Sequence, residues 1–522
     1  MVVSVKLIDA FLETPPRMFT SCKGVAPDVL DSLIYNCTGM RYREDNSTKL
    51  RPYQFEALAF ALNTRQGAML MLDMQLGKSI VALRWAEHLR RAGIWKGRGL
   101  IVAHAPVGLY VWAGEARKHS TLKLACVQNS AAELADACES DADLIAVPWA
   151  GLQNIFSRKG VISRGKRTGQ TKLYPDLDLL RDVAPEFSLV IVDEIHRAQD
   201  PYGLWFQIAR ELTAQTRFRL GLTGTPLGRD PFGMWTQSYL MDRGDTLGRS
   251  YGFFEQAFGY RQKSRFHPGG AVWKFRKRRL PILQQKLAHM SFAYIRSEVR
   301  PADIKPSRVE LAMTAPQADA YTSDLGEVIK SKSTDHHEHH FQRLRQIASG
   351  FLPYTNARGE AKVVNFPASS KLEWIDGMLA NLGDARLVIF HDFVHSGELL
   401  CKVLAKRQIS HRWIWGGGDD NAGGVAAFQT GKAQVLVANA ATGGMSINLS
   451  VADYLVFYEC PLSSRTRTQA EARPLADRGT RPLFITDLIC APIEQRILDL
   501  VQEGKTVNAS LMREAPKLVL RN

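Results

Sequence analysis

Two adjacent carboxylates follow a run of apolar residues in the first half of the chain. Residues 189–192, Leu-Val-Ile-Val, run directly into Asp193 and Glu194. Such a run is typical of a buried parallel strand, and the carboxyl ends of these strands are where open α/β sheets bind ligands. Two acids there suit a magnesium–nucleotide site, in which one carboxylate holds the metal and the next polarises a water molecule. Strand-end acids that only cap a helix are the simpler alternative.

A loop with phosphate-binding chemistry lies upstream of the acidic pair. The apolar segment Ala68–Leu72 leads into a loop that ends in Gly77, Lys78 and Ser79, and helical spacing follows. Strand, loop and helix in this order point backbone N–H groups and a helix N-terminus at an anion. We expect Lys78 to reach the β- and γ-phosphates and the Ser79 hydroxyl to bind Mg²⁺.

This loop departs from the full glycine-rich pattern. Leu72 stands five residues before Gly77, where the pattern has glycine, and Gln75 stands where a second glycine is common. Because Gly-Lys-Ser occurs often by chance, the strand and helix around it carry the prediction.

A third polar segment follows the acidic pair. Gly221–Pro226 ends a short apolar run with Thr223 and Thr225 on either side of Gly224. A loop of this kind can hydrogen-bond the acidic pair and respond to a γ-phosphate. Taken alone it is an ordinary turn, and it is informative only as the third element after the other two.

The elements that must position these residues alternate between strands and helices. Strand-like runs and helical stretches alternate in both halves, which indicates an α/β fold with two lobes of parallel strands covered by helices. The expected strands are 68–72, 100–103, 144–147, 189–192 and 219–222 in the first half, and 387–390, 412–415, 435–437, 454–458 and 483–485 in the second.

We expect five segments along the chain. They are an unassigned lead-in (1–48), a first lobe (49–243), a basic connector (244–306), a second lobe (307–510) and a short tail (511–522).

The overall charge favours a polyanionic partner. The chain has 67 Lys and Arg against 52 Asp and Glu, a net charge of +15. Two stretches, 158–172 and 261–279, contain Lys and Arg without any acid. Within the second stretch, Trp273 lies near Arg276 and Lys277, and this mixture suits stacking or wedging on nucleic acid. A solvated basic surface with inward-packed aromatics is the alternative.

The remaining composition restricts the class further. The seven cysteines are scattered without a Cys-x-x-Cys pair, so a reducing, cytoplasmic compartment fits best. No apolar run reaches the ~18–20 residues of a membrane span, and the N-terminus has no secretory signal pattern. The histidine-rich stretch 335–340 is interpreted as a solvated polar helix rather than a metal site.

The order of these motifs resembles that of superfamily 2 helicases and, within them, of the Swi/Snf-like ATPases. The likeness covers about residues 48–500. The matching segments are Leu50–Gln54, Gly77–Ser79, Ala105–Pro106 with Trp112 and Glu115, Asp193–His196, Leu222–Pro226, Phe341–Ser349, Ser370–Leu372, Val388–Phe390, Thr442–Leu449 and Gln469–Arg473.

The resemblance implies two RecA-like lobes with ATP and Mg²⁺ in the cleft between them. It assigns the metal to Ser79 and Asp193, and catalysis to Lys78 and Glu194 together with an arginine of the second lobe. The residues implied at ATP are Gln54, Gln75, Leu76, Gly77, Lys78, Ser79 and Gln469.

The catalytic arginine is not fixed by the resemblance. The family has a second arginine three residues after the first, but Ala476 stands there, and Arg478 lies two residues further on. Arg473 and Arg478 therefore both stay candidates.

The resemblance also implies contacts with nucleic acid, chiefly through phosphates. It places Pro106, Thr225, Thr442 and Gly443 at the nucleic-acid strand, in addition to the basic-connector residues named above. His196 and Thr223 would couple this strand to the nucleotide.

The first functional hypothesis is an ATP-dependent translocase on duplex or branched DNA, of a compact bacteriophage or prokaryotic type and with a role in DNA repair or recombination. A strand-separating DNA or RNA helicase is the second. A nucleic-acid-binding scaffold that has lost hydrolysis is the third, and it is motivated by Gln75 and the displaced Arg478.

Overall fold

The chain divides into two compact units, Met1–Arg300 and Pro301–Asn522, and each is described by itself. The computed structural model describes residues 5–15, 21–44, 48–64, 67–104, 106–161, 169–224, 230–263, 271–299, 303–330, 334–355, 360–440, 447–475, 478, 481–505 and 507. The division falls inside the range 244–306 that the sequence predicts as a connector, so most of that range belongs to the first unit.

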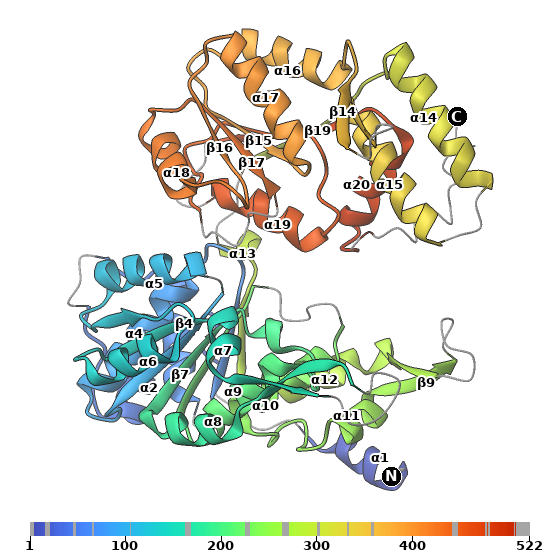
Figure 1. Ribbon diagram of the computed structural model, residues 1–522. Helices are drawn as coiled ribbons and strands as arrows, with labels where there is room; N and C mark the ends of the chain where they lie inside the picture. Colours follow the sequence, from blue (N-terminus) through green and yellow to red (C-terminus); the bar gives the residue numbers. More distant parts are fainter. Residues whose placement is uncertain are drawn as a thin grey trace. The chain divides into compact units, whose positions relative to one another are not determined.

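The first unit is built on a seven-stranded sheet whose neighbouring strands are all parallel (Figure 1). Their spatial order is β11 (Ser291–Tyr294), β1 (Ala68–Leu72), β8 (Phe218–Leu222), β7 (Phe187–Asp193), β2 (Arg98–Ala103), β4 (Leu144–Pro148) and β3 (Leu124–Cys126).

Helices follow the strands of this unit. The first group is α1 (Val5–Glu13), α2 (Pro27–Thr38), α3 (Pro52–Asn63), α4 (Lys78–Arg91), α5 (Pro106–His119), α6 (Ala131–Glu139) and α7 (Trp149–Ile155). The second is α8 (Leu177–Val183), α9 (Leu204–Ala214), α10 (Gly233–Asp242), α11 (Tyr251–Phe258), α12 (Leu280–Leu287) and α13 (Arg296–Val299), with the 3₁₀ turns η1 (Ala184–Glu186), η2 (Ile195–Ala198) and η3 (Lys277–Arg279).

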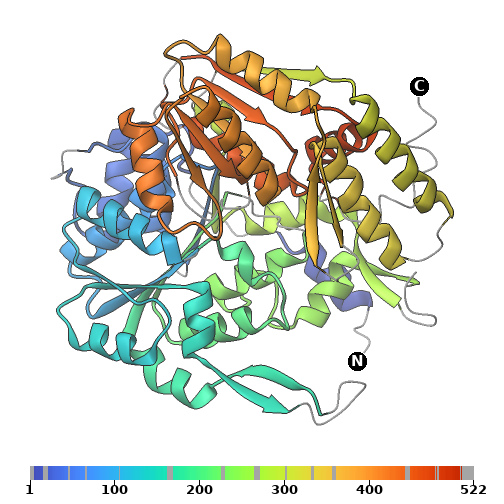
Figure 2. The ribbon, with the colours of Figure 1, turned by 45° about the horizontal axis from the view of Figure 1, so that its top comes forward.

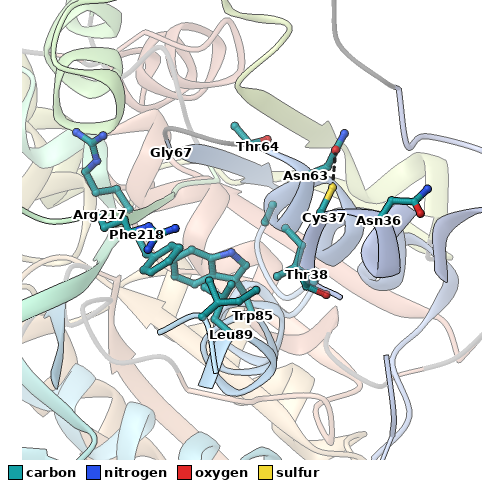
Figure 3. A pocket seen from close by; sticks show the side chains of 14 residues that line it. Asn36, Cys37, Thr38, Asn63, Thr64, Gly67, Trp85, Leu89, Arg217 and Phe218 are labelled. Atoms are coloured by element: carbon teal, nitrogen blue, oxygen red, sulfur yellow. Dashed lines mark hydrogen bonds between the residues drawn. The ribbon is translucent and has the colours of Figure 1, made fainter. Parts of the chain in front are cut away.

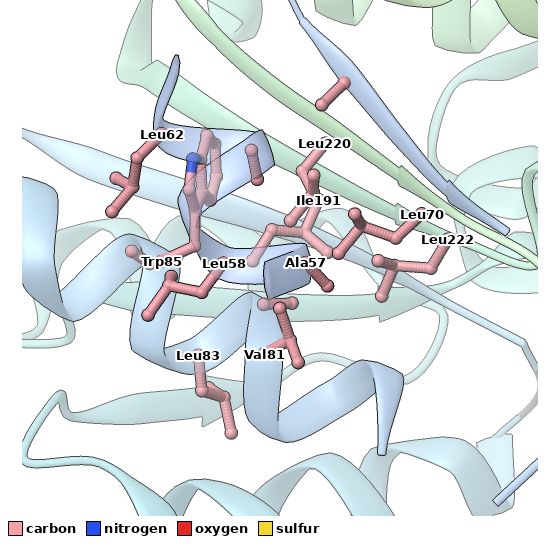
Figure 4. Close-up of a cluster of buried hydrophobic side chains, with 14 of the residues drawn as sticks. Ala57, Leu58, Leu62, Leu70, Val81, Leu83, Trp85, Ile191, Leu220 and Leu222 are labelled. Carbon is pink, nitrogen blue, oxygen red and sulfur yellow. The ribbon is translucent and has the colours of Figure 1, made fainter. Parts of the chain in front are cut away.

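Alternate strand residues of the first sheet enter two different cores, as the period of a β-strand requires. Leu70 and Leu72 belong to the cluster that includes Leu58 of α3 and Val81 of α4 (Figure 4). Met69 belongs to the cluster formed on the other face with α7, α9 and α10. The sheet is therefore buried on both faces, which explains why its strands read as continuous apolar runs.

The second unit contains a six-stranded parallel sheet. Its spatial order is β12 (Ile304–Glu310), β19 (Leu483–Ile489), β18 (Tyr454–Phe457), β15 (Leu387–His391), β17 (Val435–Asn439) and β16 (His411–Ile414). Its helices are α14 (Ala315–Lys330), α15 (Thr334–Ala348), α16 (Ser370–Ala380), α17 (Val394–Lys406), α18 (Asn421–Thr430), α19 (Ser464–Ala472) and α20 (Pro492–Gln502), with the turn η5 (Arg473–Leu475).

Three antiparallel hairpins are added to the two sheets. They are β5 (Ser157–Val161) with β6 (Thr171–Pro175), β9 (Gly259–Lys263) with β10 (Ala271–Phe275), and β13 (Phe351–Thr355) with β14 (Ala361–Asn365). Figure 2 shows the β5–β6 hairpin, in teal, extending from the first unit.

All ten strands expected from the sequence are present, and the predicted α/β fold class with parallel sheets flanked by helices is confirmed. Among the described residues, no helix combines the length and the apolar character needed to cross a membrane.

Candidate functional site

The phosphate loop lies between β1 and α4. Gly77 precedes the first residue of α4 and has a φ of 80°. Gln54 of α3 donates from Nε2 to the Leu76 carbonyl oxygen at 3.0 Å. A Cβ at Gly77 would lie 2.3 Å from that amide nitrogen, so the loop requires glycine here for both its backbone conformation and its close packing. Gln54 thus holds the loop that precedes α4.

Gln75 occupies the loop position where glycine is common and has a left-handed backbone, with a φ of 63°. Its side-chain Oε1 is buried and accepts no hydrogen bond within the described residues. The loop therefore adopts at Gln75 the conformation that glycine would allow without strain.

The Lys78 ammonium bends back over the loop. It donates to the carbonyl oxygens of Leu72, at 2.8 Å, and Asp73, at 3.3 Å. The end of β8 approaches the same group, because a Cβ at Gly224 would lie 3.4 Å from Lys78 Nζ. The loops after β1 and β8 therefore meet around one cation.

Asp193 ends β7, the neighbour of β8 in the sheet. Its Oδ1 accepts from the Glu194 backbone N–H at 2.9 Å, and its Oδ2 accepts from Trp112 Nε1 at 3.2 Å. Burial, and then the nearby Glu194 carboxylate, raise the pKa of Asp193 to about 7, while Lys78 acts in the opposite direction. A half-buried carboxylate beside a second carboxylate is a site that a cation would stabilise.

The residues present fit Mg²⁺. Magnesium takes hard oxygen ligands and is usually bound through one or two carboxylates together with substrate phosphates. The Asp193 carboxylate and the Ser79 hydroxyl supply such oxygens. In the described parts of the chain, no group of three or more His, Cys, Asp or Glu could hold a metal on its own.

Glu194 has the left-handed backbone that side chains rarely adopt, with a φ of 49°. Its Oε2 lies 3.1 Å from His196 Nδ1, and the same nitrogen lies 2.8 Å from Thr223 Oγ1. His196 and Thr223 are almost fully buried. His196 thus connects the acidic pair to the loop after β8, and the coupling role expected for His196 and Thr223 stays a prediction.

In the second unit the two candidate arginines have different surroundings. Arg473 begins η5 and is 5% exposed. Its Nη2 has no hydrogen-bond partner within the described residues, and burial lowers its pKa to about 10. Arg478 is 7% exposed, but its guanidinium donates to the carbonyl oxygens of Ala452, Pro482 and Arg481.

Helix α19, which precedes these two arginines, contains a third arginine that fixes its position. Arg467 of α19 donates to both carboxylate oxygens of Asp487 and to Glu471, and lies over the Phe457 ring at 3.5 Å. Gln469, expected at ATP, lies half-buried on the same helix.

Several predicted nucleic-acid residues are also placed. Pro106 begins α5 directly after β2. Trp273 is half-buried and packs against the first unit's core, Arg276 donates to the Gly259 carbonyl oxygen at 2.9 Å, and Lys277 is exposed. Thr225, Thr442 and Gly443 lie outside the described residues, and so does the tail 511–522.

One pocket among the described residues lies away from these motif residues. It has a volume of about 420 Å³ and opens at the N-terminal ends of β1 and β8, beside Gly67, Trp85 and Phe218 (Figure 3). The motif residues lie at the opposite, C-terminal ends of the same strands, so we assign this pocket no part in the chemistry.

The sequence did not indicate the indole contacts of the acidic strand. In addition to the Trp112 bond, Trp149 of α7 donates from Nε1 to the Asp193 carbonyl oxygen at 3.0 Å. Trp112 belongs to a motif segment, but nothing in the sequence names the acceptor of an indole N–H.

Known proteins resemble this chain in parts and as a whole. Residues 47–228 match the family described as type III restriction enzyme, res subunit. A chromodomain-helicase-DNA-binding protein 1-like from Danio rerio is 23% identical over 466 residues, which are 84% of this chain and 41% of that protein. The chain thus spans less than half the length of this relative.

Two further matches cover nearly the whole chain. The putative protein p41 of Acyrthosiphon pisum secondary endosymbiont phage 1 is 22% identical over 491 residues, which are 90% of this chain and 98% of that protein. A solved Sulfolobus solfataricus SWI2/SNF2 ATPase core in complex with dsDNA covers 92% of this chain and 97% of its own, at 18% identity and a TM-score of 0.40.

The family match and the relatives, taken with the motifs, support the likeness of this chain to superfamily 2 ATPases of the Swi/Snf-like type.

Proposed function

We propose that the chain is an ATP-driven motor that translocates along duplex or branched DNA. The observation that carries this proposal is the meeting of Lys78, Gly224, Asp193 and the His196–Thr223 pair at the carboxyl edge of one sheet. That edge is where α/β sheets bind nucleotides. The phage relative of nearly equal length supports a phage or bacterial setting.

The residues of the first unit would perform the hydrolysis as follows. Gln54 fixes the phosphate loop, and Lys78 exchanges its two carbonyl acceptors for the β- and γ-phosphate oxygens of ATP. Glu194 orients a water molecule and takes its proton as the water oxygen bonds to the γ-phosphorus. The bond from that phosphorus to ADP then breaks, giving ADP and phosphate. Mg²⁺, held by Ser79 and Asp193, would neutralise phosphate charge during this reaction.

The second unit would supply the cation that completes the site. We infer that Arg473 is the transition-state arginine, because Arg478 is bound to main-chain carbonyls and the Arg473 Nη2 has no hydrogen-bond partner within the described residues. Such an arginine typically contributes about 10³–10⁵ in rate.

DNA is proposed as the polymer along which the motor moves, because of the net charge of the chain and the description of a relative. A net charge of +15 suits a polyanion. The Danio rerio relative is described as DNA-binding. Binding through phosphates would be independent of sequence and would weaken as salt rises.

The test is the ATPase rate of the full chain alone and with duplex DNA, single-stranded DNA or RNA, beside a strand-displacement assay. We expect duplex DNA to stimulate hydrolysis without strand displacement. Displacement of a tailed duplex would favour the helicase instead, and no hydrolysis under any condition would leave only a binding scaffold.

Three variants locate the site in the same assay. Lys78→Ala and Glu194→Gln should each reduce turnover by about 10²–10³ or more. Lys123→Ala is the matched control, because Lys123 pairs with Asp141 on the exposed surface. Wild-type turnover in either site variant would remove the assignment.

A further inference from the structure

Strand β7 ends at Asp193, the proposed metal ligand, and this residue accepts hydrogen bonds from the indole groups of two neighbouring helices. Trp112 of α5 donates to the Asp193 carboxylate, and Trp149 of α7 donates to the Asp193 carbonyl oxygen. Both rings are almost fully buried, at 2% and 0% exposure. These helices follow β2 and β4, which lie on the side of β7 opposite to β8 and β1. Asp193 therefore stands between the phosphate loop and a second set of helices.

The bond to Trp112 is suited to orienting a metal ligand. Oδ1 is occupied by the Glu194 N–H, so Trp112 fixes the rotation of the carboxylate through Oδ2. An indole N–H is neutral, and it leaves the negative charge of the carboxylate available to a cation, as an arginine or lysine would not. Partners of this kind usually set ligand geometry in metal sites.

Helix α5 has an opposite face that suits a nucleic-acid strand. Tyr110 is 70% exposed, and Arg117 and Lys118 are exposed about two turns further on. Gly114 lies between them, and a Cβ there would meet no atom within 4 Å. An open surface with an aromatic ring and two cations fits a phosphate backbone.

We propose that Trp112 is a positioning residue that links nucleic-acid contact on α5 to the binding of Mg²⁺ by Asp193. This rests on the proposed function for the identity of the ligands at the two faces. A strand that binds along Tyr110 and Arg117 shifts α5, and Trp112 carries the shift to the carboxylate. DNA then lowers the Mg²⁺ concentration at which nucleotide binds.

The test compares two buried tryptophans in the full chain. Trp112→Phe removes the N–H that reaches Asp193. Trp95→Phe is the control, because Trp95 is 1% exposed and donates to the Ser188 hydroxyl at 3.0 Å, at the other end of the same sheet. The measurement is binding of fluorescent ADP during a Mg²⁺ titration, with and without duplex DNA, beside the thermal unfolding midpoint.

We expect Trp112→Phe to raise the half-saturating Mg²⁺ concentration about tenfold or more, and to leave ADP binding in EDTA unchanged. Trp95→Phe should stay within about twofold of wild type while losing similar thermal stability. In Arg117→Ala/Lys118→Ala, duplex DNA should no longer lower the Mg²⁺ requirement.

Equal Mg²⁺ requirements in Trp112→Phe and Trp95→Phe would overturn the proposal. Because ADP binding does not need turnover, the result is separate from the hydrolysis test. A chain that binds Mg²⁺–ADP through Trp112 but never hydrolyses ATP would refute the motor and leave this link intact. Normal DNA-stimulated turnover with an unchanged Mg²⁺ requirement in Trp112→Phe would refute the link alone.

Discussion

The first and second units hold their candidate catalytic residues in different ways. In the first, Lys78, Glu194, His196 and Thr223 are joined to neighbouring groups across three strand ends. In the second, Arg473 is buried with no hydrogen-bond partner for its Nη2 among the described residues. The first site is preorganised by its own polar contacts, whereas the second keeps a desolvated cation whose stabilisation must come from elsewhere. In our account that stabilisation comes from the nucleotide.

Replacing Arg473 should give the largest effect. No hydrogen bond among the described residues offsets the burial of Arg473 Nη2, so Arg473→Met should leave the unfolding free energy unchanged or higher. Turnover should fall by about 10³ or more, because the transition-state charge loses its cation. Steady-state ATPase and thermal unfolding measure the two quantities, with the exposed Arg412→Met as control. A stability loss with normal turnover would make Arg473 a structural residue.

Replacing Arg478 should have the opposite result, which is a loss of stability with little change in turnover. The Arg478 guanidinium donates to four carbonyl oxygens, and lysine cannot reach all of them. Arg478→Lys should therefore lower the unfolding free energy by about 2 kcal/mol, with little change in turnover per folded molecule. Denaturant unfolding beside an active-site titration separates the two quantities. A loss of turnover without a loss of stability would exchange the roles of Arg478 and Arg473.

The link between the acidic pair and β8 should affect coupling more than chemistry. Thr223→Val keeps the volume and removes the hydroxyl beside His196. We expect the stimulation of hydrolysis by duplex DNA to fall about tenfold, with basal hydrolysis within about twofold of wild type. Thr213→Val is a matched control, because its buried hydroxyl bonds only to helix carbonyls. The coupling role fails if both valine variants keep full stimulation.

The helix that begins at Lys78 should make stability depend on pH. His88 lies near its far end, and burial, with Arg91, lowers the His88 pKa from 6.5 to about 4. The unfolded state then binds more protons below pH 6.5, so stability is full above that pH and is lost as pH falls towards about 4.

We expect a loss of about 1 kcal/mol between pH 6.5 and about 5.5 from His88 alone. His88→Gln should show a flatter profile in urea unfolding over this range. An identical slope in wild type and variant would mean that His88 does not carry the effect.

The sequence predicted the parts of the fold whose residues have one simple environment. Strands such as β1 and β7 are buried on both faces, so their continuous apolar runs could be recognised as strands in the sequence. β12 was not, because it is an exposed edge strand that contains Lys305, Pro306 and Arg308. β11 was missed inside the segment predicted as a basic connector, although it pairs with β1 and leads to Arg296, whose backbone N–H donates to Asp73.

The candidate site could likewise be predicted from the sequence only in part. Spacing predicted Lys78, Asp193 and Glu194, because strand-end chemistry has a sequence pattern. The contacts between them depend on which strands are neighbours in space, and β8 and β7 are separated by only one helix whereas β1 and β8 are far apart in sequence. The different surroundings of Arg473 and Arg478 could not be read from two arginines five residues apart.

A structure of the chain with Mg²⁺, ADP and aluminium fluoride tests the central claim most directly. We predict that the fluoride lies within hydrogen-bond reach of Lys78 and of the Arg473 guanidinium, while Arg478 keeps its carbonyl partners. Nucleotide bound away from the β1–α4 loop, or fluoride contacted by neither Arg473 nor Arg478, would contradict the account.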